Sequence, residues 1–117
     1  MTTLRHYAVS KNSAVILIIG RLDVVGCQMI EDPLWDIIQR YPSITIVLDL
    51  SFVDFVSSYG VGCLVEACGI VTEYGGRMSI SSPKPQVYET LYLNGADMVI
   101  PIYESPQMAL ADNHIQH

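Results

Sequence analysis

The segment that most constrains the fold is a buried-looking strand followed directly by a turn and a helix. Residues 44–50 are almost continuously apolar, as in strands covered on both faces of a parallel or mixed sheet. Beyond the turn, apolar side chains recur at helical spacing at Val61, Leu64, Val65, Cys68 and Val71. This strand–turn–helix unit predicts an α/β fold.

Segments on either side extend this unit to the order ββαβαβαβα. Further strands are expected at 6–10, 14–19, 77–80 and 98–102, and further helices at 86–93 and 105–110. A short polar connection joins the first two strands, so they should form an antiparallel hairpin. Pro101 weakens the last strand, which should therefore lie at an edge. Right-handed crossovers then give a four- to five-stranded mixed sheet with helices stacked mainly on one side.

The helix between the second and third strands contains a proline. Its apolar face is formed by Cys27, Ile30, Leu34, Ile37 and Ile38. Proline is destabilising inside a helix but well tolerated in the first turn. Two interpretations remain: Asp32 caps a helix that starts at Pro33, or an earlier helix bends at Pro33.

Composition narrows the class of protein. The 117 residues correspond to one domain, expected at 3–112 and followed by a frayed polar tail at 113–117. The net charge of −6 and the few scattered basic residues argue against nucleic-acid binding and against docking on an anionic membrane. No apolar run reaches the length of a membrane span, and the first residues lack a signal-peptide core. The default expectation is a cytoplasmic protein without membrane insertion.

The cysteines and histidines give no sign of a metal site or a disulfide framework. The three cysteines are an odd number, and Cys63 and Cys68 diverge by about 140° around a helix. All three cysteines are interpreted as small apolar residues. The histidines are scattered along the chain, at His6, His114 and His117. We therefore expect neither a metal nor another cofactor.

The turn between the apolar strand at 44–50 and the helix with apolar residues from Val61 to Val71 contains Ser57-Ser58-Tyr59-Gly60-Val61-Gly62. A seryl hydroxyl at this place has two possible roles. It can cap the adjoining helix, or it can accept a phosphate beside the positive end of that helix. For Ser58 both roles stay open, and Ser57 is the alternative residue for either.

Taken together, these features give the chain a resemblance to the STAS domain, and in particular to the bacterial anti-sigma factor antagonists. The resemblance covers about residues 7–110 and is distributed over several short segments, namely Gly20-Arg21-Leu22-Asp23, Val47 to Ser51, the Ser58 turn with Gly60-Val61-Gly62, Gly75-Gly76-Arg77, Ser82 to Val87, and Leu91 to Gly95. It implies the STAS fold and a role in protein–protein association.

The resemblance also implies roles for individual residues. The turn of that family reads Asp-Ser-Ser-Gly, and a partner kinase phosphorylates its first serine, which corresponds to Ser58. Here Ser57 stands at the acidic position and Tyr59 at that of the second serine. Asp23 corresponds to an acidic residue near this turn, and it could equally cap the helix after it. The resemblance implies a partner-binding surface formed by Asp23, Ser57, Ser58, Tyr59 and Gly60.

The function implied is that of a regulator without catalytic residues of its own. In its unphosphorylated form it would bind an anti-sigma factor with serine kinase activity, and a serine phosphatase would reverse the phosphorylation. No nucleophile elbow, phosphate loop or carboxylate pair marks an enzyme. Two alternatives remain. One is a constitutive STAS scaffold in a transporter or signalling complex, and the other is a sensor of a nucleotide or small ligand.

Overall fold

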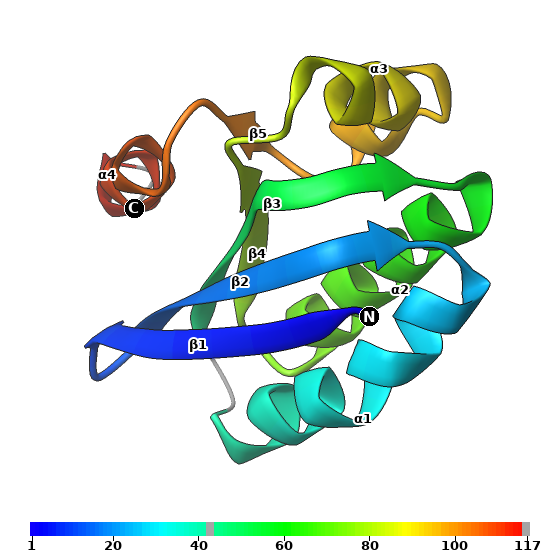
Figure 1. Ribbon diagram of the computed structural model, residues 1–117. Coiled ribbons are helices and arrows are strands. Elements are labelled where there is room, and N and C mark those ends of the chain that lie inside the picture. The colour runs from blue at the N-terminus through cyan, green and yellow to red at the C-terminus, as the bar shows by residue number, and fades with distance from the viewer. Residues whose placement is uncertain (42–43, 116–117) are drawn as a thin grey trace.

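The computed structural model describes residues 1–41 and 44–115. In chain order, the elements in this part of the chain are β1 (Thr3–Ser10), β2 (Ser13–Leu22), α1 (Val24–Arg40), β3 (Thr45–Val56), α2 (Ser58–Glu73), β4 (Arg77–Ser81), α3 (Pro85–Leu93), the 3-10 helix η1 (Ala96–Met98), β5 (Ile102–Tyr103) and α4 (Pro106–Ile115). The predicted order of strands and α-helices is confirmed (Figure 1).

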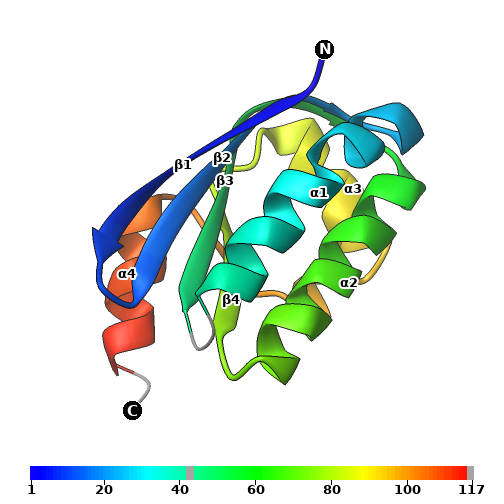
Figure 2. The same ribbon diagram turned by 90° about the horizontal axis from the view of Figure 1, so that it is seen from below.

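The strands form one mixed sheet in the order β1-β2-β3-β4-β5. β1 and β2 are an antiparallel hairpin, whereas β2, β3, β4 and β5 are parallel. Helices α1 and α2 cover one face of the sheet, and α4 lies against the other face (Figure 2). The predicted fold class and the edge position of β5 are confirmed.

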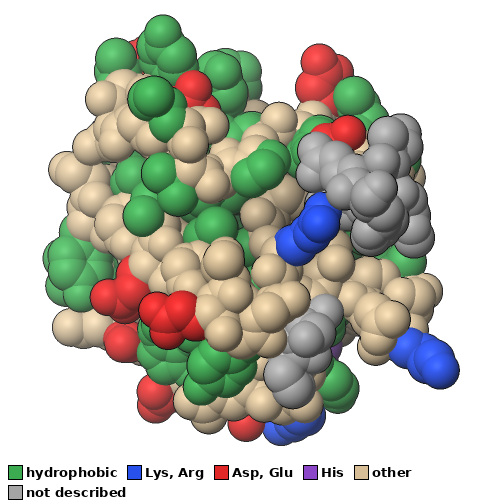
Figure 3. All heavy atoms as spheres, turned by 180° about the vertical axis from the view of Figure 1, so that it is seen from behind, with side chains coloured by type: hydrophobic (Ala, Val, Ile, Leu, Met, Phe, Trp, Pro, Cys, Tyr) green, Lys and Arg blue, Asp and Glu red, His purple; other side chains and the backbone are tan. Residues whose placement is uncertain are grey.

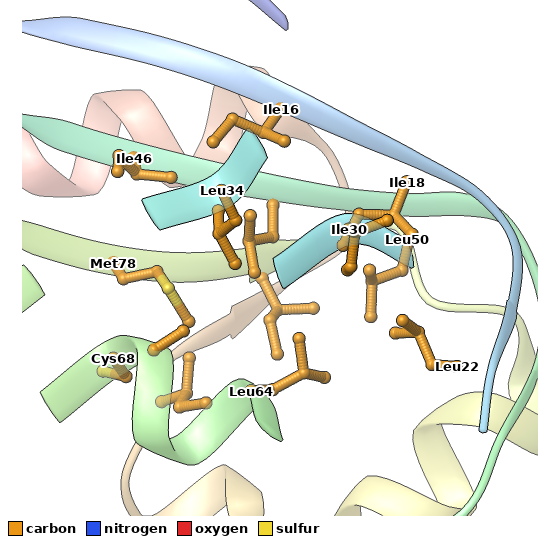
Figure 4. Close-up of a cluster of buried hydrophobic side chains, with 14 of the residues drawn as sticks. Ile16, Ile18, Leu22, Ile30, Leu34, Ile46, Leu50, Leu64, Cys68 and Met78 are labelled. Carbon is orange, nitrogen blue, oxygen red and sulfur yellow. The ribbon is translucent and has the colours of Figure 1, made fainter. Parts of the chain in front are cut away.

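The main core lies between the sheet and the helices α1, α2 and α3. Alternate residues of β2 and β3 point toward these helices because successive side chains of a strand face opposite sides. Figure 4 shows Ile16, Ile18, Ile46 and Leu50 directed toward Ile30, Leu34 and Leu64 of the helices. Each such side chain stabilises the fold by about 1.5–3 kcal/mol when fully buried. This core fixes the relative positions of the two parallel strands and their helices.

A smaller cluster lies on the opposite face of the sheet, beneath α4. Val15 of β2 and Val47 of β3 pack there with Ala109 of α4. The Tyr103 hydroxyl donates a hydrogen bond to the Asp112 carboxylate. Burial and this contact raise the pKa of Tyr103 to about 12. Helix α4 is thus the exception to the expected stacking of helices on one side.

Strand β3 runs six residues past its predicted end at Leu50 and continues to Val56. The pairing of β2 with β3 shifts between Leu17 and Ile19. Near this point the Asp49 carboxylate accepts a hydrogen bond of 2.9 Å from the Ser51 amide. The shift breaks the simple alternation of buried and exposed residues, so the sequence pattern does not reveal the end of the strand.

Two further expectations concern prolines. Helix α1 runs through Pro33 without interruption, so the alternative in which Asp32 caps a helix starting at Pro33 is wrong. The predicted strand at 98–102 is also wrong over most of its length. Met98 ends η1, and only Ile102 and Tyr103 pair with β4. Pro101 cannot donate a ladder hydrogen bond, and this agrees with its position outside the strand.

At the carboxyl end, α4 extends to Ile115, five residues beyond its predicted end. The predicted polar tail at 113–117 is therefore helical as far as Ile115, and residues 116–117 lie outside the described residues. The predicted domain boundaries at 3–112 stay a prediction. Within the part of the chain that the structure describes, no helix is long and apolar enough to cross a bilayer.

Candidate functional site

Two strand-to-helix turns lie side by side at the carboxyl ends of β2 and β3. Leu22 and Val56 are register partners at the ends of these parallel strands. The Leu22 carbonyl accepts hydrogen bonds from the Ser57 amide at 3.0 Å and from the Ser57 hydroxyl at 3.2 Å. The turn before α1 and the turn before α2 are therefore held together by one backbone carbonyl.

Ser57, and not Ser58, caps α2. The Ser57 hydroxyl oxygen accepts a hydrogen bond of 3.1 Å from the Gly60 amide. The capping role considered for Ser58 is therefore wrong, because Ser58 is already the first residue of the helix. The Ser58 side chain is exposed, and its hydroxyl has no hydrogen-bond partner among the described residues. Ser58 thus presents a free hydroxyl at the positive end of α2.

Asp23 caps α1, one of the two roles expected for it. Its carboxylate accepts a hydrogen bond of 2.8 Å from the Gly26 amide and forms an ion pair of 3.4 Å with Arg21. The hydrogen bond from Gly26 holds the pKa of the Asp23 carboxyl below its ordinary value, and Arg21 acts in the same direction. Asp23 therefore remains a carboxylate at neutral pH, next to the turn that carries Ser58.

Gly60 allows α2 to approach β2 closely. A Cβ atom at Gly60 would lie 2.1 Å from the Leu22 carbonyl oxygen, which is a severe overlap with backbone. Gly26 occupies the equivalent place in α1, where a Cβ would lie 1.9 Å from the Arg21 carbonyl oxygen. Gly60 is buried, so its observed role is to permit this packing. The contact with a partner expected for it stays a prediction.

Exposed apolar side chains lie on the same turn as Ser58 and on the adjoining turn. Tyr59 is 52% exposed on α2, and Val24 and Val25 are 45% and 64% exposed on the first turn of α1. We call the surface formed by Asp23, Val24, Val25, Ser58 and Tyr59 the turn face. The sequence prediction missed the two valines. Their position directly after the cap, off the buried stripe of α1, was the signal that could have revealed them.

A shallow groove borders the turn face. It runs between α1 and α2 and is lined by Glu31, Tyr59, Gly62, Cys63 and Glu66. Its two carboxylates make the groove acidic. On the face of the molecule in Figure 3, the basic side chains lie apart from one another. The turn face thus combines exposed apolar groups with an acidic border, as a surface for a protein with apolar and basic side chains would.

On the other side of the turn face, Arg21 stacks on an aromatic ring. The Arg21 guanidinium lies 4.3 Å from the centre of the Phe55 ring, on neighbouring strands. Arg21 also pairs with Asp23, so one cation links the end of β3 to the cap of α1. Within the described part of the chain, no group of three or more His, Cys, Asp or Glu side chains could hold a metal ion.

Comparison with known proteins identifies the family. A family model described as the STAS domain matches residues 6–109. This span includes both turns, most of the sheet and the first turn of α4. The chain therefore belongs to the STAS domain family, and the resemblance inferred from its sequence is confirmed.

Several individual proteins are similar to the chain. The chain is 28% identical over 98 residues to an anti-sigma F factor antagonist from Paenibacillus polymyxa, and the match covers 84% of each protein. Its fold is similar to that of unphosphorylated SpoIIAA, an anti-sigma factor antagonist, with a TM-score of 0.78 and 19% identity over 98% of this chain and 99% of that one. The phosphorylated form of the Bacillus cell fate determinant SpoIIAA matches with a TM-score of 0.69 and 18% identity, covering 95% and 99%.

Proposed function

We propose that this chain is an anti-sigma factor antagonist that binds its partner through the turn face and is switched by phosphorylation of Ser58. The partner is an anti-sigma factor with serine kinase activity, and a serine phosphatase restores the unmodified form. The chain itself supplies a binding surface and a phosphate acceptor and catalyses no reaction. The relative from Paenibacillus polymyxa supports the antagonist role.

The observation that carries the proposal is the free hydroxyl of Ser58. A hydroxyl that caps a helix must leave its hydrogen bond before a kinase can phosphorylate it, whereas Ser58 is exposed and uncapped. Ser57, the alternative acceptor, holds two hydrogen bonds at the turn. Phosphorylation of Ser58 therefore leaves the cap of α2 in place, which favours Ser58 over Ser57.

The surroundings of Ser58 suit a protein partner. Tyr59 and Val25 are large, exposed apolar groups close to the acceptor, and aromatic residues often dominate the binding energy of interfaces. The carboxylates of Glu31 and Glu66 border the same surface. We therefore expect the partner to present apolar side chains to the centre of the turn face and basic side chains to the groove.

Phosphorylation would act on the interface rather than on the fold. A phosphoserine carries a charge of about −1.5 to −2 at neutral pH. The Asp23 carboxylate lies on the adjoining turn, and two unit charges would repel by about 3 kcal/mol if they were about 6 Å apart at an effective dielectric constant of 20. The helix end offsets this by only about 0.3–1 kcal/mol. The phosphate would also occupy space on the turn face, where the partner is proposed to dock.

The first experiment tests the acceptor. The protein is incubated with its cognate kinase and ATP, and intact-mass spectrometry counts the phosphates added. We expect one phosphate on the wild-type protein and none on Ser58→Ala. Ser105→Ala is the matched control, because Ser105 accepts an amide hydrogen bond at the start of another helix and lies outside the turn face. Phosphate on Ser57 would move the site, and no phosphate from an active kinase would favour a constitutive scaffold.

The second experiment tests the binding surface. Tyr59→Ala and Val25→Ala should each weaken binding to the anti-sigma factor by at least about tenfold, or 1.4 kcal/mol. Tyr74→Ala is the matched control, since Tyr74 lies at the opposite end of α2 and is 41% exposed. Equal losses for Tyr59→Ala and Tyr74→Ala would rule out the turn face as the specific contact.

A further inference from the structure

Two cysteines that are far apart in the sequence meet beneath the turn face. Cys27 of α1 and Cys63 of α2 lie close enough for each thiol to affect the pKa of the other. They also line the same cavity between the two helices, together with Leu34, Trp35 and Ala67. The cavity measures about 10 Å³, which leaves room for at most about one water molecule. Both cysteines thus border a space with little room for anything besides their own side chains.

Cys63 can be reached from solvent, whereas Cys27 is only 1% exposed. The Cys63 side chain lines the acidic groove as well as the inner cavity. Beside it, a Cβ atom at Gly62 would meet nothing within 4 Å, so the surface next to Cys63 is open. A small molecule in the groove can therefore reach Cys63, whereas Cys27 lines only the inner cavity.

We propose that Cys27 and Cys63 form a reversible disulfide that joins α1 to α2, with a small-molecule disulfide as the oxidant. The proposal rests on the cavity that the two cysteines share, the effect of each thiol on the pKa of the other, and the one-sided access from the groove. Cys68, the third cysteine, is not part of the pair. It lies further along α2, where it interacts with Thr72.

With glutathione disulfide as the oxidant, the reaction has two exchange steps. The Cys63 thiolate attacks one sulfur of glutathione disulfide, so that a bond forms between Cys63 and one glutathione while the other leaves as a thiolate. The Cys27 thiolate then attacks the Cys63 sulfur, the bond between the two cysteines forms, and the second glutathione leaves as a thiolate. The cysteines lose two protons and two electrons, and glutathione disulfide is reduced to two glutathione thiols.

The surroundings of the thiols decide how the reaction should be measured. Burial, with a smaller contribution from Cys63, raises the pKa of Cys27 to about 12. Burial also raises the pKa of Cys63, although the hydrogen bond from Cys27 opposes this in part. Both thiols are therefore poor nucleophiles at neutral pH, and exchange will be slow. An equilibrium measurement avoids this dependence on rate.

A disulfide between Cys27 and Cys63 would restrain the two helix starts that carry the turn face. Cys27 lies four residues beyond Asp23, which is about one helical turn, and Cys63 lies five residues beyond Ser58. The bond would hold the first turns of α1 and α2 at one separation. Val25 and Tyr59, which lie on opposite sides of this seam, would then be fixed relative to each other.

The test is an equilibration of the reduced protein in buffers of fixed glutathione to glutathione disulfide ratio, followed by alkylation and peptide mapping. We expect a disulfide between Cys27 and Cys63, with Cys68 recovered as an alkylated thiol. The disulfide should form at least about 30-fold more readily in the folded protein than in the urea-unfolded chain, which corresponds to about 2 kcal/mol of stabilisation. A smaller ratio would overturn the proposal.

Two cysteine variants test which cysteines form the disulfide. Cys68→Ser should form the disulfide as the wild-type protein does, whereas Cys63→Ser, at the half-buried position, should form none. Pairing that includes Cys68, a persistent mixed disulfide at Cys63, or a disulfide between two chains in place of the intramolecular bond would each contradict the proposal. The wild-type comparison of folded and unfolded protein decides the case even if Cys63→Ser does not fold.

Discussion

The turn before α1 and the turn before α2 use the same backbone arrangement with different side chains. In each, the cap side chain accepts a hydrogen bond from the amide three residues later, at 2.8 Å from Gly26 and 3.1 Å from Gly60. In each, that residue is a glycine whose Cβ would overlap a backbone carbonyl of β2. The repeated geometry arises because two parallel strands end together and lead into two adjacent helices.

The two turns differ in charge and in the residues directly after the cap. Asp23 brings a carboxylate and an ion pair, and two exposed valines come next. Ser57 is neutral and bonds to the neighbouring turn through Leu22, and an exposed serine and tyrosine come next. The first turn therefore has a permanent charge, whereas the second can gain a charge at Ser58. Substitutions and ligands directed at each turn should have effects of very different size.

A substitution that disturbs the backbone geometry shared by the two turns should have the largest effect on the stability of the protein. Gly60→Ala places a methyl group against the Leu22 carbonyl, so we expect a loss of about 3 kcal/mol or more in the free energy of unfolding. Gly62→Ala is the control on the same helix, because its Cβ meets nothing; it should stabilise by about 0.5–1 kcal/mol. Urea denaturation of both variants measures the difference. Similar stabilities would mean that the helix moves aside at little cost.

A charge added at the second turn should affect binding more than folding. Ser58→Asp is expected to weaken partner binding by about tenfold, or 1.4 kcal/mol, because its carboxylate lies near that of Asp23. Its circular dichroism spectrum should match that of the wild-type protein. Calorimetric titration with the anti-sigma factor measures the affinity. Unchanged affinity with the partner on the turn face would refute the electrostatic switch, and lost helicity would indicate a folding defect.

Loss of the Ser57 cap at the second turn should reduce the free energy of unfolding by less than Gly60→Ala does. Ser57→Ala removes the hydrogen bond to Gly60 and the one to Leu22, so we expect a loss of about 1 kcal/mol in the free energy of unfolding. Because Ser57 does not titrate, the loss should be the same at neutral and acidic pH. Urea denaturation at two pH values tests both statements.

The cap of the first turn should depend on pH. The pKa of Asp23 is lower in the folded protein than its ordinary value of 3.8. Its charge therefore stabilises the fold above that value, and this stabilisation is lost as the pH falls through the folded pKa. Asp23→Asn keeps a capping side chain without the charge. In urea denaturation, its stability should lie below that of the wild-type protein at neutral pH and approach it in acid. If the stability difference between the wild-type protein and Asp23→Asn grew in acid, the Asp23 charge would not stabilise the fold in the way proposed.

Of the measurements proposed here, the titration with free nucleotides should give the smallest signal. Two helix ends lie at this edge of the sheet, but the Asp23 carboxylate already caps one of them and repels phosphate. Calorimetric titration with ATP, ADP or GTP should reveal no binding tighter than about 1 mM, or about −4 kcal/mol. Micromolar binding to the isolated chain would instead support a nucleotide sensor.

Sequence patterns predicted the parts of the fold that depend on local periodicity. The apolar strand at 44–50 and the helical stripe from Val61 to Val71 are both present. The extension of β3 to Val56 was missed because its pairing with β2 shifts register, which depends on a neighbouring strand. The strand at 98–102 was overestimated because Met98 belongs to η1 and only Ile102 of this segment pairs with β4.

The candidate site was only partly visible in the sequence. The resemblance brought Asp23 and Ser58 to one place, and the structure places them on adjoining turns. The choice of Ser57 as the cap depends on a shift of one residue at the helix start, which local pattern does not fix. The meeting of Cys27 with Cys63 depends on how α1 packs against α2, so no spacing within either helix could predict it.

The strand order of the sheet has a consequence for biosynthesis. Every strand lies next to its neighbour in the chain, so no later strand has to be inserted between two that are already paired. As the chain leaves the ribosome, the sheet can grow from one edge, and the hairpin of β1 and β2 provides its first template. Both helix caps beside the turn face belong to the first half of the chain. The surface proposed to meet the partner would thus be assembled before α4 is synthesised.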